Sequence, residues 1–143
     1  MKDSLVLTVP VFSMLANEAF RLRRAVFIDE QKVPEEEEFD AEDFTADHVV
    51  ALGGGEVRGT LRIMLDDEHV KIGRVVVHRS WRGRGVASAM IRYAMEKHRD
   101  TRANRFFLTA QSDKLELYRP FGFLAFGEEF FDAGMPHRAM RNY

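Results

Sequence analysis

The feature that most constrains the fold is the order of predicted strands and helices in the middle of the chain. Strand-like runs at 48–52, 57–65 and 69–77 follow one another with only short turns between them, which predicts an antiparallel meander. An amphipathic helix over 83–99 then separates the third strand from a short strand at 105–110. A strand, helix, strand succession joins parallel neighbours by a right-handed crossover. The sequence therefore predicts a mixed sheet flanked by helices.

Further elements are predicted on either side of this unit: a strand at 4–9, a helix at 13–31, a short helix at 112–119, and strands at 121–131 and 137–143. Ser13 and Ser112 are the expected N-caps of the two helices. The chain has 143 residues, of which 45% are hydrophobic. This length favours a single α/β (or α+β) domain over residues 1–143.

Composition excludes several classes of protein. The sequence has no cysteine, which removes disulfide scaffolds, cysteine zinc sites, iron–sulfur clusters and thiol catalysis. Its five histidines lack the spacing of zinc motifs, so no metal is expected. No apolar run reaches the roughly 18–20 residues of a membrane span, and Met1–Pro10 lacks the pattern of a signal peptide. We therefore expect a cytoplasmic protein without a membrane partner.

Charge is divided unevenly along the chain. The net charge is −2, but residues 1–70 carry 7 basic and 16 acidic side chains, whereas residues 71–143 carry 14 basic and 7 acidic ones. Eight of the acids fall within 35–47, which predicts a solvated loop with Phe39 and Phe44 turned inward. The basic half is expected to face a polyanion.

A glycine-containing loop between the third strand and the following helix is the best candidate for that contact. Gly83 and Gly85 let a ligand approach the backbone, and Arg82 and Arg84 add positive charge. The first N–H groups of a helix have no intrahelical partner and lie at the positive end of its dipole. The loop therefore suits a phosphate or pyrophosphate, although the same glycine pair also occurs in ordinary tight turns.

The identity of this phosphate ligand is narrowed by the surrounding residues. A dinucleotide-binding fingerprint needs a third glycine, where this chain has Ser88, and an acid at the end of the next strand, which is also missing. A P-loop needs a Gly-Lys-Ser/Thr sequence, which does not occur here. Nucleic acid is not the expected partner, because the acidic segment would repel a phosphate backbone.

Two motifs in this order resemble those of the GNAT (Gcn5-related N-acetyltransferase) superfamily. Arg-x-x-Gly-x-Ala at 82–87 resembles its acyl-CoA pyrophosphate loop, and Tyr-x-x-x-Gly-Phe at 118–123 resembles a second element of the family. The segments 24–34, 38–48 and 134–140 are similar to the ElaA/YjcF-like branch. The resemblance implies a twisted sheet whose central parallel strands splay apart to admit the pantetheine arm of acetyl-CoA.

The resemblance also implies roles for individual residues. Tyr118 would be the general acid that protonates the departing thiolate, since a phenol with a pKa near 10 carries a proton at neutral pH. A backbone N–H of the valine strand would polarise the thioester carbonyl. The residues implied to bind acetyl-CoA are Val75, Val76, Val77, Arg82, Gly83, Arg84, Gly85, Val86, Ala87 and Gln111.

The acceptor side is less well defined by the sequence. The residues expected to line it are Phe27, Glu30, Gln31, Glu38 and His137. The general base is left open among Glu30, Glu38, Asp40, His48 and His137, acting directly or through water. The acidic segment 35–47 would favour a cationic acceptor, or would serve only for solubility.

The expected function is acetyl-CoA-dependent transfer of an acetyl group to the amine of a small molecule or peptide, by direct attack in a ternary complex. One alternative with the same fold is an acyltransferase like the acyl-homoserine-lactone synthases. A second is a non-catalytic acyl-CoA sensor, and a third is a dinucleotide-binding oxidoreductase. Either a monomer or a homodimer is expected.

Overall fold

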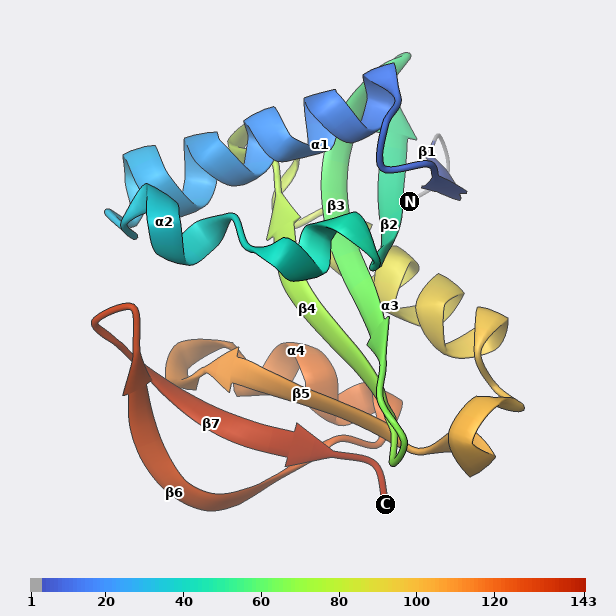
Figure 1. Ribbon diagram of the computed structural model, residues 1–143, viewed down its shortest axis with the longest axis vertical. Helices are drawn as coiled ribbons and strands as arrows, with labels where there is room; N and C mark the ends of the chain where they lie inside the picture. The colour runs from blue at the N-terminus through green and yellow to red at the C-terminus, as the bar shows by residue number, and fades with distance from the viewer. Residues whose placement is uncertain (1–3) are drawn as a thin grey trace.

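The computed structural model describes residues 4–143 and contains a seven-stranded mixed sheet in the order β1-β2-β3-β4-β5-β7-β6 (Figure 1). Residues 1–3, which belong to the predicted domain 1–143 and to Met1–Pro10, lie outside the described residues. The strands are β1 (Ser4–Val9), β2 (Asp47–Gly53), β3 (Glu56–Leu65), β4 (Val70–Val77), β5 (Phe106–Gln111), β6 (Leu124–Asp132) and β7 (Met135–Arg141). Among the described residues only β4 and β5 pair in parallel, and β2, β3 and β4 pair antiparallel in order, so the predicted meander and crossover are confirmed.

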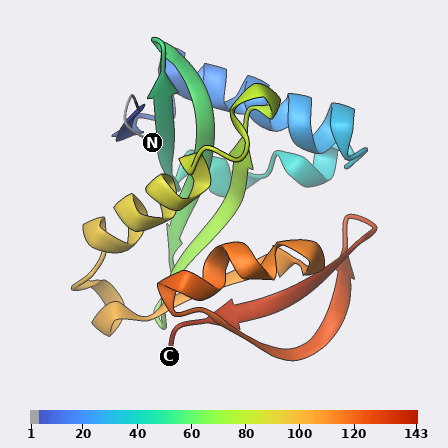
Figure 2. The ribbon, with the colours of Figure 1, turned by 180° about the vertical axis from the view of Figure 1, so that it is seen from behind.

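Helices cover both faces of this sheet. On one face lie α1 (Met14–Arg23), its π-helical continuation (Arg24–Glu30) and α2 (Glu35–Glu38), as Figure 1 shows. On the other face lie α3 (Val86–Lys97) and α4 (Leu115–Tyr118), seen in front of the sheet in Figure 2. Short 3-10 turns occupy Ala41–Phe44, Arg79–Trp81, Thr101–Asn104, Ser112–Lys114 and Arg119–Phe121. The predicted fold class, a mixed sheet flanked by helices, is confirmed.

The main core lies between the sheet and α3. The buried face of α3 contributes Val86, Met90, Ile91 and Ala94, which pack on apolar side chains of the central strands. Gly59 of β3 allows this close approach, because a Cβ there would lie 2.8 Å from Val86 Cγ1 and 2.9 Å from Met90 Cε. The start of α3 is thereby fixed against the middle of the sheet.

β4 and β5 diverge soon after they begin. Within the described residues their ladder contains only the pairs Val70–Phe106 and Lys71–Phe107. A β-bulge in β4 accompanies the divergence, since three steps from Gly73 to Val76 match two steps on β3, and Arg74 has φ 52°. A bulge bends its strand and increases its local twist. The predicted splay of the central parallel strands is therefore present, and the bulge contributes to it.

Some details of the predicted helices are confirmed and others are wrong. Ser13 caps α1 by accepting a hydrogen bond from the Ala16 N–H at 3.2 Å. The helix expected over 13–31 is α-helical only to Arg23 and continues with π-helical hydrogen bonding. Ser112 caps no helix, because its hydroxyl bonds to Glu129 Oε2 at 2.8 Å and a 3-10 turn precedes α4.

The prediction of a solvated loop over 35–47 is wrong. The segment forms α2 and the 3-10 turn Ala41–Phe44, and it buries the side chains of Glu38 and Asp43. Phe39 is half-buried, whereas Phe44 is 65% exposed instead of turned inward. Three arginines from outside the segment neutralise its buried carboxylates, which a count of local charges does not reveal.

Candidate functional site

A cavity of about 390 Å³ lies where β4 and β5 diverge. Residues 72–77 of β4 form one wall, and residues 109–111 of β5 form the opposite wall. Residues of the π-helix and of α2 close one side, and His137 of β7 lies next to Gln111 in the strand ladder. Most of the residues that the sequence assigned to acyl-CoA and to the acceptor therefore lie around one space.

The β4 wall offers unpaired backbone on the side that faces β5. Val75, Val76 and Val77 line the cavity, and on their other side Val76 and Val77 pair with β3. Because the ladder with β5 ends at Lys71, the backbone of 75–77 has no strand partner across the cavity among the described residues. An extended ligand can bond to such an edge as an added strand would.

The start of α3 has the features of an anion site. Its N-cap is Gly85, which has φ 81° and no side chain to cap the helix, and the first turn contains no acid. Gly83 also has a positive φ, of 77°, so these two glycines form a conformation that other residues adopt at a cost. The free N–H groups at this end of the helix remain available to an anion.

The residues predicted around this loop are not all at the cavity wall. Arg82 and Ala87 line it, whereas Gly83, Arg84, Gly85 and Val86 do not. Arg84 stacks on Trp81 with its guanidinium carbon 4.7 Å from the ring centroid, and Val86 is buried in the core. A role for the four residues outside the wall would thus depend on backbone N–H groups or on shape.

Tyr118 lies at the end of α4 and lines the same cavity. Its residue is only 7% exposed, and its ring packs edge-on against Phe123 with centroids 6.2 Å apart. Burial raises the pKa of the Tyr118 phenol above its usual value, because the charged form loses hydration. The phenol is therefore protonated at neutral pH.

Glu30 and Gln31, at the end of the π-helix, contact the loop after β4 and the end of β5. Arg82 donates two hydrogen bonds to the Glu30 carboxylate, at 2.9 and 3.0 Å. Gln111 donates its amide N–H to Gln31 Oε1 at 2.9 Å. The hydrogen bonds from Arg82 lower the pKa of Glu30 below its usual range. Phe27, one turn earlier, also lines the cavity.

His137 presents one ring nitrogen as an acceptor. Its Nδ1 lies 2.8 Å from the carbonyl oxygen of Met135, which can only accept a hydrogen bond. Nδ1 therefore carries the proton in this contact, and Nε2 of the neutral ring has a free lone pair. Phe130 stacks on the same ring with centroids 6.0 Å apart, which fixes its orientation.

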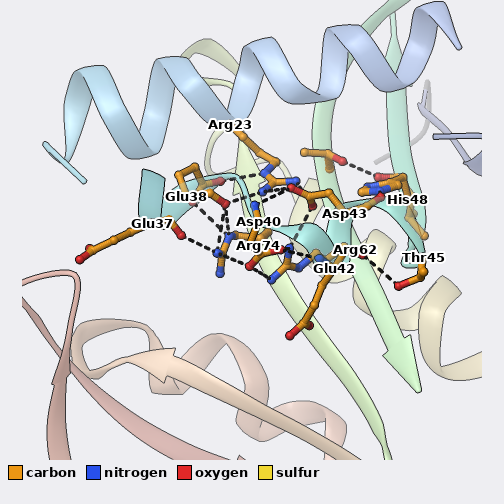
Figure 3. A network of polar contacts seen from close by, with 12 residues as sticks. Arg23, Glu37, Glu38, Asp40, Glu42, Asp43, Thr45, His48, Arg62 and Arg74 are labelled. Atoms are coloured by element: carbon orange, nitrogen blue, oxygen red, sulfur yellow. Dashed lines mark hydrogen bonds and ion pairs between the residues drawn. The ribbon is translucent and has the colours of Figure 1, made fainter. Parts of the chain in front are cut away.

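The acidic segment is held by a buried network of ion pairs (Figure 3). Arg23, which is 1% exposed, donates to Glu38 Oε2 and to Asp43 Oδ1, both at 2.7 Å. Arg62 donates to Asp40 Oδ1 at 2.7 Å and to Asp43 Oδ1 at 2.9 Å. The network thus joins α1 and β3 to the segment that closes the cavity.

Arg74 completes the network from the bulge of β4. Its Nε lies 3.1 Å from Glu38 Oε1, and its Nη2 donates to the carbonyl oxygens of Glu37 and Glu38 at 3.1 Å. Arg74 therefore has both a left-handed backbone conformation and a side chain that binds α2. No local pattern in the sequence could identify this network, because its arginines come from three different elements.

The network shifts the pKa values of its carboxyl groups in different directions. The hydrogen bond and charge of Arg62 outweigh burial and lower the pKa of Asp40. Burial alone would raise the pKa of Asp43, but hydrogen bonds from Arg23 and Arg62 bring it below its usual value. At Glu38 burial outweighs Arg23 and Arg74, so its pKa is raised.

The five candidates for a general base therefore differ in whether they line the cavity and whether an arginine already pairs with them. Glu30 is paired with Arg82, and Glu38 and Asp40 are held by the network. His48 is buried outside the cavity wall, with Nε2 2.7 Å from the carbonyl oxygen of Asp43. His137 alone among the five lines the cavity without an ion-pair partner in the described part of the chain.

Two kinds of feature are absent from residues 4–143. No group of three or more His, Cys, Asp or Glu side chains there has the arrangement of a metal site. No helix in this range is both long and apolar enough to cross a bilayer.

Comparison with known proteins identifies similar chains. Residues 14–123 match the sequence profile of the acetyltransferase (GNAT) family. The chain is 35% identical over 124 residues to the uncharacterized N-acetyltransferase YjcF of Bacillus subtilis (strain 168), covering 86% of this chain and 89% of YjcF. The crystal structure of Escherichia coli ElaA superposes with a TM-score of 0.84 at 28% identity and covers all of both chains. An acyl-CoA N-acyltransferase from Pseudomonas aeruginosa gives the same TM-score and identity, over 99% of each chain.

Proposed function

We propose that this chain, which belongs to the acetyltransferase (GNAT) family, is an N-acetyltransferase that moves an acetyl group from acetyl-CoA to an amine. The observation that carries the proposal is the diverging pair β4 and β5. It combines an unpaired β4 edge, a cavity beside that edge and an uncapped helix start at Gly85. An edge, a cavity and an anion site in this order match the peptide-like arm and the phosphates of an acyl-CoA.

The residues around the cavity would bind an acyl-CoA with its phosphates at α3 and its pantetheine arm along β4. The N–H groups at the start of α3, with Arg82 beside them, would hold the phosphates. The backbone of 75–77 would hold the pantetheine arm, and one of its N–H groups would stabilise the oxyanion. Acyl-CoA would supply a thioester, the activated form of the acetyl group.

Two side chains at the cavity would move the protons of the reaction. An alkylammonium has to lose a proton before it attacks, and His137 Nε2 would accept it, directly or through water. A C–N bond then forms to the acetyl carbon and the C–S bond breaks. Tyr118 would protonate the departing thiolate, and the second proton of the attacking nitrogen would then restore the Tyr118 phenol. Burial keeps this phenol protonated at neutral pH, which it must be to act as an acid.

Part of the cavity wall would favour a cationic acceptor, on narrower grounds than the acidic segment 35–47 as a whole. Glu38, Asp40 and Asp43 are neutralised by arginines and contribute little net charge. Lys71 and Lys114 line the cavity without an ion pair among the described residues, and so do Glu37 and Asp132. These two carboxylates would favour an ammonium at the acceptor side.

The test is release of CoA thiol from acetyl-CoA with a panel of amines, polyamines, amino acids and peptides. We expect release with at least one class of amine, and a fall of about 10²-fold or more in the Tyr118→Phe variant, which loses its proton donor. Tyr93→Phe is a matched control, because Tyr93 bonds to Thr8 at 2.8 Å and does not line the cavity.

The outcomes of this test separate the alternatives. Binding of acetyl-CoA without thiol release from any amine would favour an acyl-CoA sensor. Release that requires S-adenosylmethionine would favour a lactone-synthase-like reaction. Failure to bind CoA would contradict the proposal.

A further inference from the structure

One ion pair joins the residues proposed for the acyl donor to those proposed for the acceptor. Glu30 ends the π-helix, and Arg82 precedes the helix start that would hold the phosphates. The guanidinium uses Nη1 and Nη2 for the two carboxylate oxygens, at 2.9 and 3.0 Å. The side chains are 40% exposed at Arg82 and 35% exposed at Glu30, so an anion from solvent can reach the pair.

Neighbouring contacts hold this pair in place. Arg82 Nε also donates to the carbonyl oxygen of Val77, at the end of β4, at 3.1 Å. Gln31, next to Glu30, bonds to Gln111 at the end of β5 at 2.9 Å. Residues 30 and 31 therefore connect the diverging ends of the two strands across the cavity.

A carboxylate bound in this way occupies the same N–H groups that a phosphate would use. Arginine presents a planar pair of N–H donors that matches either anion bidentately. Once both Nη atoms donate to Glu30, a second anion can no longer form the same bidentate pair of hydrogen bonds with Arg82. Glu30 and a phosphate of CoA would therefore compete for Arg82.

We infer, on the basis of the proposed function, that Glu30 is an internal competitor for the CoA phosphates and is displaced from Arg82 when CoA binds. Displacement leaves the Glu30 carboxylate at the cavity wall without its arginine. Arg79 and Lys114 remain near it, and with Glu37 and Asp132 it becomes a carboxylate that can hold the ammonium of the acceptor. Acyl-donor binding thus creates part of the acceptor site.

The experiment is isothermal titration of CoA into the purified protein and three variants. Glu30→Gln keeps the shape of the side chain and removes its charge, so we expect CoA to bind about two- to fivefold more tightly, as for loss of an exposed ion pair. Arg82→Gln is expected to weaken binding. In the double variant Glu30→Gln/Arg82→Gln the gain is expected to disappear, because the competition requires both groups.

Asp29→Asn is the matched control for loss of negative charge. Asp29 is the adjacent residue, is exposed and does not line the cavity. We expect its substitution to change CoA affinity less than Glu30→Gln does. Equal gains in both variants, or no gain in Glu30→Gln, would overturn the inference and leave the proposed function intact. If wild-type protein binds no CoA, the proposed function fails and this inference fails with it.

Discussion

Arg23 contacts two carboxylates in a space closed to water, and the energetic cost of removing it follows from that burial. It is 1% exposed and bonds to Glu38 and Asp43. Removing one partner of a buried pair leaves the others charged and unsolvated. We expect Arg23→Met to lower the free energy of unfolding by about 3–5 kcal/mol, measured by urea denaturation.

The neighbouring residue provides the control for this prediction. Arg24 pairs with Glu35 on the surface, where water replaces a lost partner. Arg24→Met is expected to change the urea midpoint little. Similar losses in the two variants would show that the buried network does not support the fold in the way described.

The same network predicts how stability changes with pH. The pKa values of Asp40 and Asp43 are lower in the folded protein than the unfolded value of about 3.9. The unfolded state therefore binds more protons in acid, and stability from these groups is lost as pH falls below about 4. The raised pKa of Glu38 acts in the opposite direction and reduces the effect.

We expect the urea midpoint to be lower near pH 3 than near pH 6. In the Asp43→Asn variant, the urea midpoint should differ less between pH 3 and pH 6 than it does in the wild type, because position 43 no longer titrates. A wild-type midpoint that rises on acidification would mean that Glu38 dominates the network.

Individual site residues could be predicted from the sequence where the family resemblance names them. Arg82, Ala87, Gln111 and Tyr118 were expected around one ligand, and all four line one cavity. The pairing of Arg82 with Glu30 was not foreseen, because the two residues are far apart in sequence and meet only in the folded chain. Their proposed roles in binding and catalysis stay predictions.

At the scale of elements, Gly59 controls how closely α3 packs on the sheet. A side chain at this position would meet Val86 and Met90 at distances no real Cβ keeps. We expect Gly59→Val to lower the free energy of unfolding by about 1–3 kcal/mol, the usual range for overpacking, and to reduce CoA binding by shifting the start of α3.

Gly73→Ala is the corresponding control in β4, because nothing lies within 4 Å of a Cβ built there. It should retain the melting temperature of the wild type. If thermal unfolding shows equal stability for both variants, the close contact between β3 and α3 does not limit the packing.

The order of the elements could be predicted from the sequence, but their local hydrogen bonding could not. Alternating and helical patterns were sufficient to place β1 to β7 and α3 within a few residues. The change from α1 to a π-helix after Arg23 leaves no mark in the hydrophobic pattern, since Val26 is buried as a regular helix would require. That change nevertheless determines where Glu30 and Gln31 lie.

At the scale of the whole molecule, the divergence of β4 and β5 determines the position of the cavity. The meander and the crossover made a mixed sheet predictable, and the resemblance to a known family implied the splay. The sequence alone could not show that the parallel ladder ends at Lys71 and Phe107, because the bulge at Arg74 that follows it, and the contacts of Arg74 with α2, have no local sequence pattern.

The uneven charge of the chain also has a structural explanation at this scale. Part of the acidic half is neutralised internally by Arg23, Arg62 and Arg74, the last of which belongs to the basic half. Arg79, Arg82 and Arg84 of the basic half closely precede α3 in the sequence, where we propose that the phosphates of CoA bind.

The most direct test of the central claim is a crystal structure of the protein with CoA. We predict that the pantetheine arm lies between β4 and β5 along residues 75–77. We also expect the pyrophosphate to contact the start of α3 and Arg82 to have turned from Glu30 to a phosphate. CoA bound outside this cavity, or a cavity closed by continued pairing of β4 with β5, would contradict it.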